Sequence, residues 1–230
     1  MQSTGTRSLA EGALEVASLE DLSWILDPTV NLVTWRRPEL AGVAAVAGAM
    51  SGEVGKYSRL ILRCGEEDLV EAVGSLLPEP ALELDPGAAA LWTEDIVHLC
   101  EAFADLVQAE DLMISLEGPA EATCPRFHVD RVGIRMLVTY AGPGSEWLAE
   151  ADVDRRWLGE AGQGLPDEEN GVIRDGGSAR TVEPFSVTLL KGEAWPGADG
   201  FGAVHRSPDP AGAPRLLLRV DMLSQAQVDQ

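Results

Sequence analysis

Basic side chains are scarce in this sequence. Its 230 residues include 17 Lys and Arg against 38 Asp and Glu, which gives a formal net charge of −21. The isoelectric point lies near 4.3. A surface of this charge would repel a nucleic-acid backbone or an anionic bilayer. We therefore expect neither a nucleic-acid partner nor a membrane partner.

Long apolar runs and cysteine pairs are also missing. No stretch approaches the roughly 18 apolar residues of a membrane-spanning helix. The first 20 residues lack the basic start and apolar stretch of a secretory signal. The three cysteines are widely spaced and form no Cys-x-x-Cys pair, which argues against a disulfide framework and a cysteine-rich zinc module. These absences predict a cytoplasmic protein with reduced thiols.

Common catalytic motifs are absent as well. The chain contains no G-x-S-x-G nucleophile motif, and "GPGSEW" follows a strand pattern without opening an apolar helix, so it does not fit a phosphate loop. The hydrophobic content of 45% is nevertheless ordinary for a folded domain with a full core. A binding site or active site of this protein must therefore be sought among its few remaining polar patterns.

The sequence pattern divides the chain into four parts. Residues 1–20 are polar without periodicity and predict a flexible N-terminal arm. Residues 21–111 alternate short strand and helix patterns and include a long amphipathic helix over 88–108. Helical periodicity ends near residue 112, and residues 112–223 read as a β region. Residues 224–230 are expected to form a C-terminal tail.

The β region consists of short β-branched or leucine-rich runs separated by Gly, Pro and Asp. Strings of such strands form sandwiches or barrels, and a cupin-like jelly roll is one architecture that protects their edges. We predict an α+β protein in which the N-terminal helical and mixed region packs on this β region. The acidic, glycine-rich segment over residues 150–183 reads as a surface excursion or lid. The expected strands are "LMISLEG", "FHVDRV", "IRMLVTY", "FSVTLLKG", "GAVHRS" and "RLLLRVDML".

Within this region "FHVDRV" places His128 and Asp130 two residues apart, the spacing that puts both side chains on one face of a strand. The chain has only three histidines, and His205 in "AVHRSP" supplies a third candidate ligand. Two histidines and one carboxylate form a facial triad, which leaves open positions on a ferrous ion. The alternative interpretation of the first pair is a solvated strand face.

Cys124 offers a competing ligand set. It stands four residues before His128, so a Cys-x3-His-x-Asp pattern together with His205 could enclose a metal ion with four protein ligands. Closed four-coordinate sites that include thiolate are typical of structural zinc. The sequence leaves the iron and zinc interpretations open.

Ten residues after His205 comes Arg215, and arginine binds carboxylates through two parallel hydrogen bonds. This order of His-x-Asp, distant His and Arg resembles the ferrous iron and 2-oxoglutarate-dependent oxygenases, a double-stranded β-helix family. The resemblance implies that His128, Asp130 and His205 bind Fe(II) and that Arg215 binds 2-oxoglutarate. Arg219 competes for the second role, because it shares the parity of Arg215 on the last strand.

A longer pattern, "CPRFHVD…VTYAGPGSEW…LLKGEAW…GAVHRSP", more closely resembles a bacterial domain family of unknown function whose genes tend to accompany zinc-responsive operons. That resemblance covers about residues 20–223, but it brings no activity with it. Two functions follow from these patterns. One is a 2-oxoglutarate-dependent dioxygenase acting on a small molecule or an amino-acid-like substrate. The other is a non-catalytic zinc-binding protein of metal homeostasis.

Overall fold

The computed structural model of the chain describes residues 6–51, 58–63, 68–118, 124–197, 200–209 and 214–223. Its strands are β1 (Arg7–Ala10), β2 (Ala13–Val16), β3 (Leu32–Trp35), β4 (Ser58–Arg63), β5 (Asp111–Glu117), β6 (Ile134–Ala141), β7 (Glu146–Leu148), β8 (Arg180–Thr181), β9 (Val187–Lys191), β10 (Val204–Arg206) and β11 (Leu216–Leu223). Its α-helices are α1 (Val43–Met50), α2 (Leu69–Gly74), α3 (Glu79–Leu84) and α4 (Pro86–Val107), and its 3-10 helices are η1 (Glu20–Leu26), η2 (Arg155–Trp157) and η3 (Gly159–Gly162).

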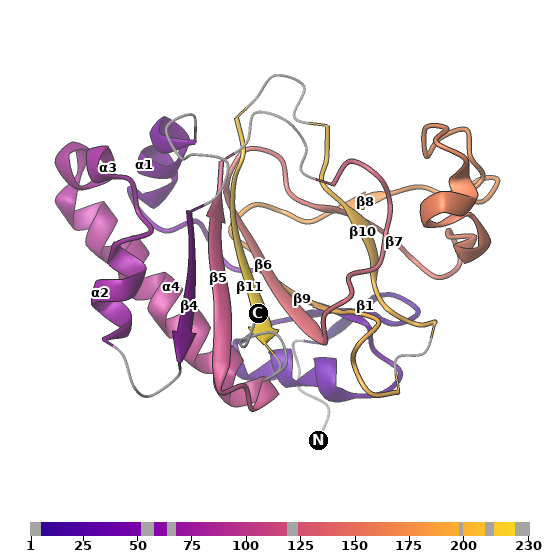
Figure 1. Cartoon of the computed structure of the whole chain (residues 1–230), viewed down its shortest axis with the longest axis horizontal. Coiled ribbons are helices and arrows are strands. Elements are labelled where there is room, and N and C mark those ends of the chain that lie inside the picture. The colour runs from indigo at the N-terminus through magenta and orange to yellow at the C-terminus, as the bar shows by residue number, and fades with distance from the viewer. Residues whose placement is uncertain are drawn as a thin grey trace.

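The strands form one large sheet and one small sheet. The large sheet has the order β1-β2-β3-β9-β6-β11-β5-β4, and the small sheet has the order β10-β7-β8. Every neighbouring pair is antiparallel except β2 and β3. Helices α1 to α4 lie beside one face of the large sheet, and β7, β8 and β10 lie beyond its other face (Figure 1). The protein is therefore a mixed helix and sheet structure built on a large, mostly antiparallel sheet.

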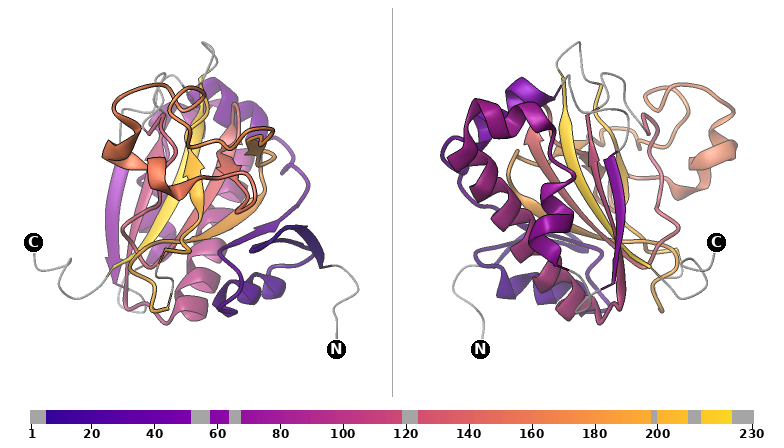
Figure 2. Two further views of the ribbon diagram at one scale, coloured as in Figure 1. Left: turned by 90° about the vertical axis from the view of Figure 1, so that its right-hand side faces the viewer. Right: turned by 60° about the vertical axis from the view of Figure 1, so that its left-hand side comes forward.

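The long helix α4 covers the large sheet because one of its faces is apolar. Asp85 caps its start by accepting a hydrogen bond from the backbone N–H of Ala88 at 3.0 Å, and Pro86 occupies the first turn. The helix ends at Gln108, which adopts a left-handed conformation. Figure 2 shows α4 running along the sheet with the shorter helices beside it. The buried residues of its apolar face are Trp92, Ile96, Leu99, Phe103 and Val107.

The two faces of the large sheet carry different side chains because successive residues of a strand point in opposite directions. On β11, Leu216, Leu218 and Val220 belong to the main core beneath the helices. Leu217 belongs instead to a smaller apolar cluster between the two sheets, together with Trp147 of β7. The side chains that follow in the same alternation, Arg219 and Asp221, are polar, so this second face provides the setting of the candidate site.

The N-terminal part differs from the sequence-based expectation. Residues 7–16, predicted to lie in a flexible arm, form the hairpin β1–β2 at the edge of the large sheet. The strands β3 and β4 also join that sheet, so the region 21–111 is not a separate layer packed on the β region. The hairpin joins the sheet through β3, and β3 and β4 pair with β9 and β5, which are distant in sequence. Such partners could not be read from the local pattern. The predicted tail over 224–230 lies outside the described residues.

Candidate metal site

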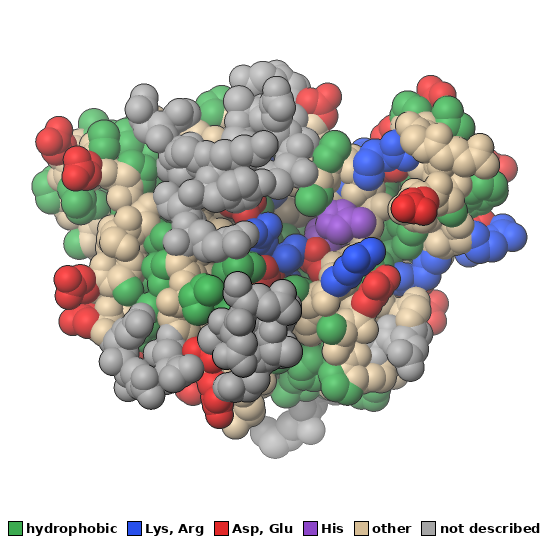
Figure 3. Space-filling view, viewed as in Figure 1, with side chains coloured by type: hydrophobic (Ala, Val, Ile, Leu, Met, Phe, Trp, Pro, Cys, Tyr) green, Lys and Arg blue, Asp and Glu red, His purple; other side chains and the backbone are tan. Residues whose placement is uncertain are grey.

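His128, Asp130 and His205 converge in the structure. Each offers one ligand atom, and these atoms all lie within 4.8 Å of one another. Nε2 of His205 lies 3.2 Å from Oδ2 of Asp130, and Nε2 of His128 lies 3.5 Å from Oδ1. Asp130 and His205 are buried, whereas His128 is partly exposed. Histidine is visible on this face of the molecule, with basic side chains around it (Figure 3).

Backbone pairing brings the two histidines together. The N–H of each residue donates to the C=O of the other at 3.0 Å, which makes an isolated antiparallel bridge beside β10. Their ring centroids are consequently 4.6 Å apart. The predicted strand over "FHVDRV" is reduced to this bridge, but the His128 and Asp130 side chains still turn toward the same point.

Hydrogen bonds to the backbone fix the orientation of both imidazole rings. Nδ1 of His128 lies 2.8 Å from the carbonyl oxygen of Arg126, and Nδ1 of His205 lies 3.1 Å from that of Ala203. A carbonyl oxygen only accepts hydrogen bonds, so each Nδ1 carries the proton. With the proton on Nδ1, the Nε2 atom of each ring faces the Asp130 carboxylate, and in the neutral form of the ring this atom carries the lone pair. Ligating histidines are commonly oriented by such a contact at the other ring nitrogen.

The Asp130 carboxylate is suited to a bound cation. Its Oδ2 is buried and has no hydrogen-bond partner among the described residues, while Oδ1 accepts from Nη1 of Arg135. Burial by itself would raise the pKa of Asp130, but His205, His128 and Arg135 outweigh burial and hold the pKa well below its usual range. An ionised carboxylate facing two imidazole lone pairs is unfavourable unless a proton or a metal cation lies between them. The donor set fits a divalent metal that accepts nitrogen and oxygen ligands.

The backbone of Asp130 is held by the turn that follows β9. The N–H of Glu193 donates to the C=O of Asp130 at 2.8 Å, and the N–H of Gly192 donates to the C=O of Gly133 at 2.8 Å. A Cβ at Gly192 would lie 2.2 Å from the carbonyl oxygen of Val132 and 2.7 Å from that of Asp130. Only glycine permits this approach, so the "KGE" turn has a structural role at the site.

A row of buried charges extends from Asp130 across the large sheet. Arg135 on β6 also donates to both carboxylate oxygens of Asp221 on β11. Nε of Arg219 lies 3.5 Å from Oδ2 of Asp221, and Nη1 of Arg219 lies 2.9 Å from Oε1 of Glu117 on β5. Burial raises the pKa of Glu117, against the attraction of Arg219. Arg219, one of the two predicted co-substrate anchors, is therefore already engaged by carboxylates.

Arg215, the other predicted anchor, has no such partner among the described residues. Its side chain is buried and donates to hydroxyl oxygens, at 2.7 Å to Ser145, 3.3 Å to Ser207 and 3.4 Å to Thr139. Within the same part of the chain, its Nε has no hydrogen-bond partner. Burial lowers the pKa of Arg215 to about 10, against a weaker effect of Glu117. A buried guanidinium surrounded by hydroxyl groups can accept an anionic ligand without first breaking an ion pair.

A narrow pocket connects the surroundings of Arg215 with the metal ligands. It lies between the two sheets, and its wall includes His205 together with Thr139 and Ser145, two of the hydroxyl residues that Arg215 contacts. Its free volume is about 10 Å³, which is room for about one water molecule. A larger ligand would need side chains to move. The other polar residues of its wall are Glu146, Ser186 and Thr188.

Cys124 stands apart from the three converging residues. The group of candidate ligand atoms formed by the described residues contains His128, Asp130 and His205 but not the Cys124 thiol, and Cys124 is exposed. Its backbone C=O accepts a hydrogen bond from the N–H of Ser207 at 2.9 Å, which places the segment beside the site. Burial of part of the side chain, with the charge of Asp130 acting in the same direction, raises the pKa of its thiol.

The sequence patterns did not reveal the hydrogen-bond and ion-pair partners of the candidate ligands. The parity of β6 shows that Arg135 and Tyr140 cannot face the same side, but it does not choose between them. In the structure Arg135 faces Asp130, and Tyr140 lies in the main core and donates to Asp95 of α4 at 2.6 Å. The alternation of Arg219 and Asp221 was the one available signal for a charged strand face. The ion pairs on this strand face, however, join residues of strands that are distant in sequence.

Among the described residues, no helix has both the length and the apolar character needed to cross a bilayer.

The family model of a protein of unknown function, DUF1826, matches residues 17–221 of the chain. A search of curated proteins gives no match. Several solved structures resemble the fold. The rice dioxygenase for auxin oxidation has 12% identity and a TM-score of 0.44, covering 90% of this chain and 78% of its own.

Two further likenesses have the same low identity. A C-terminally truncated protein of Neurospora crassa, solved in apo form, has 12% identity and a TM-score of 0.47, covering 96% of this chain and all of its own. A prolyl-4-hydroxylase of Pseudomonas putida has 12% identity and a TM-score of 0.45, covering 90% of this chain and all of its own. These likenesses concern the path of the chain, and its chemistry must be sought in its own residues.

Proposed function

Since the chain belongs to the DUF1826 family, whose function is unknown, we propose from its own site that it is a mononuclear Fe(II)- and 2-oxoglutarate-dependent dioxygenase acting on a small molecule. The observation that carries this proposal is the combination of three convergent ligands with a buried arginine that lacks a carboxylate partner among the described residues. The fold we propose for the β region is a double-stranded β-helix, supported by the large and small sheets that enclose the pocket between them.

His128, Asp130 and His205 would hold the metal. Three protein ligands of this type leave positions free for a co-substrate and oxygen, and two imidazoles with one carboxylate suit ferrous iron. Bound ferrous iron would supply the redox chemistry that couples decarboxylation of 2-oxoglutarate to oxidation of a substrate. A structural zinc site would be expected to have a fourth protein ligand, and Cys124 does not join the group.

Arg215 would hold the distal carboxylate of 2-oxoglutarate. Its hydroxyl partners, Ser145 and Thr139, line the pocket that also reaches His205, so a dicarboxylate in this pocket could contact the guanidinium at one end and the metal at the other. The anion would provide the counter-charge that Arg215 lacks within the described part of the chain. Arg219 is unsuited to this role because Glu117 and Asp221 already neutralise it.

The proposal can be tested on the purified protein in two steps. Metal analysis followed by calorimetric titration should give one divalent ion per chain, with Fe(II) and Co²⁺ bound, and Asp130→Ala should weaken binding by at least about tenfold. With metal bound, 2-oxoglutarate should then bind to the wild type and fail to bind to Arg215→Met. Succinate release under air would show turnover. Tight zinc binding without 2-oxoglutarate binding would instead support the metal-homeostasis function.

A further inference from the structure

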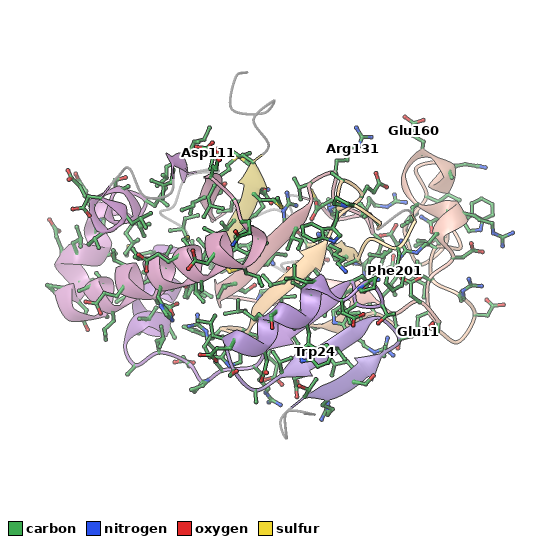
Figure 4. The ribbon with its side chains drawn as sticks, turned by 90° about the horizontal axis from the view of Figure 1, so that it is seen from below. Glu11, Trp24, Asp111, Arg131, Glu160 and Phe201 are labelled. Carbon is green, nitrogen blue, oxygen red and sulfur yellow. The ribbon has the colours of Figure 1, made fainter. Side chains whose placement is uncertain are left out.

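A buried carboxylate from the acidic excursion reaches the segment that carries His128. Asp167, which is 3% exposed, lies between η3 and β8 in the chain. This excursion projects from the two sheets, with Glu160 of η3 at its outer part (Figure 4). Oδ1 of Asp167 accepts from Nε of Arg126 at 2.7 Å, and Oδ2 accepts from the backbone N–H of Phe127 at 2.7 Å. Nη1 of Arg206, the residue after His205, also donates to Oδ2, at 3.3 Å. One carboxylate thus contacts both ligand-bearing segments.

The contact with Phe127 has a direct connection to the metal ligand. The N–H of Phe127 and the C=O of Arg126 belong to the same peptide group. That C=O accepts from Nδ1 of His128 at 2.8 Å. A continuous chain of hydrogen bonds therefore runs from the Asp167 carboxylate through one peptide group to the imidazole whose Nε2 faces Asp130.

We propose that Asp167 is a positioning residue for His128 that acts through the peptide group between Arg126 and Phe127. An ionised acceptor at the N–H polarises the peptide and makes its carbonyl a stronger acceptor, by about 10–30% per bond in such chains. The stronger carbonyl holds the Nδ1–H tautomer and the ring orientation, and it makes Nε2 a better donor to a metal. The inference rests on the proposed metal site, although its first consequence concerns the metal-free protein.

The two histidines differ in what binds the peptide group that accepts their Nδ1 hydrogen bond. Nδ1 of His205 donates to the carbonyl of Ala203 over a longer distance, 3.1 Å. The peptide group of that carbonyl leads into β10, and no side-chain carboxylate of the described residues is seen to accept from its N–H. His205 is therefore an internal control within one molecule. A general loosening of the site would change both rings, whereas loss of the Asp167 relay would change His128 alone.

Glu168 supplies a matched control variant. It is the neighbouring acidic residue, and its carboxylate also pairs with Nη1 of Arg206, at 3.0 Å. Its side chain is 60% exposed, so its replacement disturbs little of the protein interior. Asp167→Asn and Glu168→Gln each remove one negative charge near Arg206, but only the first alters the peptide that serves His128.

The first measurement is nitrogen-15 NMR of the histidine side chains of the metal-free wild type, at a pH where His128 is neutral. We expect the Nδ1–H tautomer at His128 and a scalar coupling across the hydrogen bond from the Phe127 amide nitrogen to the Asp167 carboxyl carbon. In Asp167→Asn the Nε2–H tautomer should become populated at His128, with His205 unchanged. Co²⁺ affinity should then fall about tenfold, and by less than about twofold in Glu168→Gln.

Several outcomes would overturn the inference. A wild type with the Nε2–H tautomer at His128, or without the coupling between Phe127 and Asp167, would refute it even if Asp167→Asn failed to fold. Equal changes at both histidines, or equal losses of Co²⁺ affinity in Asp167→Asn and Glu168→Gln, would show a merely structural role. If the wild type bound no metal at all, the proposed function would fail, while the tautomer of His128 would still decide the relay.

Discussion

Replacing Arg215 by methionine should stabilise the protein in the absence of ligand and abolish binding of 2-oxoglutarate. The Arg215 side chain is buried at 7% exposure, and its hydrogen bonds go to hydroxyl groups. Because burial lowers its pKa to about 10, the folded state holds this proton less tightly than the unfolded chain does. The free-energy penalty for burying the charged guanidinium is fully present at neutral pH, and it is relieved only as the pH rises through about 10.

The size of the effect follows from that change in pKa. A fall from the ordinary value for arginine to about 10 corresponds to roughly 3 kcal/mol of cost to the charged form. Methionine removes this cost and loses one good hydrogen bond from a charged group, that to Ser145 at 2.7 Å, which is worth roughly 1.5–3 kcal/mol. The two contacts beyond 3.2 Å contribute less. We therefore expect Arg215→Met to raise the free energy of unfolding by up to about 1.5 kcal/mol.

Urea unfolding of the metal-loaded protein, with and without 2-oxoglutarate, measures both effects. The wild type should gain about 2.7 kcal/mol when the ligand is present at 100 times its dissociation constant, and Arg215→Met should gain nothing. Arg219→Met, in the strand β11 that Arg215 immediately precedes, is the matched control. Because it leaves Glu117 buried without its ion-pair partner, while Asp221 keeps Arg135, it should lose about 3–5 kcal/mol.

A loss of stability in Arg215→Met as large as that in Arg219→Met would contradict a buried Arg215 without a counter-charge. That result would mean that Arg215 already has a counter-charge in the free protein and is not available for a dicarboxylate. Retention of 2-oxoglutarate binding by Arg215→Met would refute its role as anchor independently of stability.

Three further predictions concern other residues. Cys124→Ala should leave the affinity for Co²⁺ within about twofold of the wild-type value in calorimetry, since the thiol lies outside the group of candidate ligand atoms. A loss of affinity of about tenfold or more would make Cys124 a ligand. Burial opposes protonation of His128, but hydrogen bonds to the Asp130 carboxylate and to a backbone carbonyl outweigh burial and raise the pKa of His128. The affinity for Co²⁺ should therefore fall as the pH decreases, beginning above about 6.5. An affinity that stays constant between about pH 6 and 8 would contradict this prediction. Asp95→Ala should lower the free energy of unfolding by about 3–5 kcal/mol, because it leaves the buried Arg37 guanidinium without its carboxylate partner. As a control, replacing the exposed neighbouring residue in Glu94→Ala should change the free energy of unfolding by less than about 0.5 kcal/mol. Equal effects of the two substitutions would show that the ion pair of Arg37 adds little stability.

The sequence by itself pointed to the candidate ligand set and to most of the later strands. Histidine is so rare in this chain that His128 and His205, with Asp130 two residues from the first, were the natural candidates, and the structure brings all three together. The strands over 134–141 and 216–223 could be read from β-branched and leucine-rich runs, because their alternation is a local property of the chain.

Tertiary structure decided which charges are paired. In the sequence only the spacing from His205 favoured Arg215 over Arg219. In the structure, β5 brings Glu117 to Arg219, and Arg215 lies among hydroxyl groups. The hairpin of residues 7–16 likewise acquires its strands from pairing within the large sheet.

The role of Asp167 in the acidic excursion was also hidden in the sequence. It meets the Phe127 amide across 40 residues of chain, in a segment whose composition indicated only an exposed loop. Ion pairs and hydrogen bonds of this kind depend on which segments become neighbours after folding and on how much water is excluded around them. Neither the neighbouring segments nor the exclusion of water can be read from the local pattern of residues. The sequence could therefore name the candidate metal ligands but not the groups that orient them.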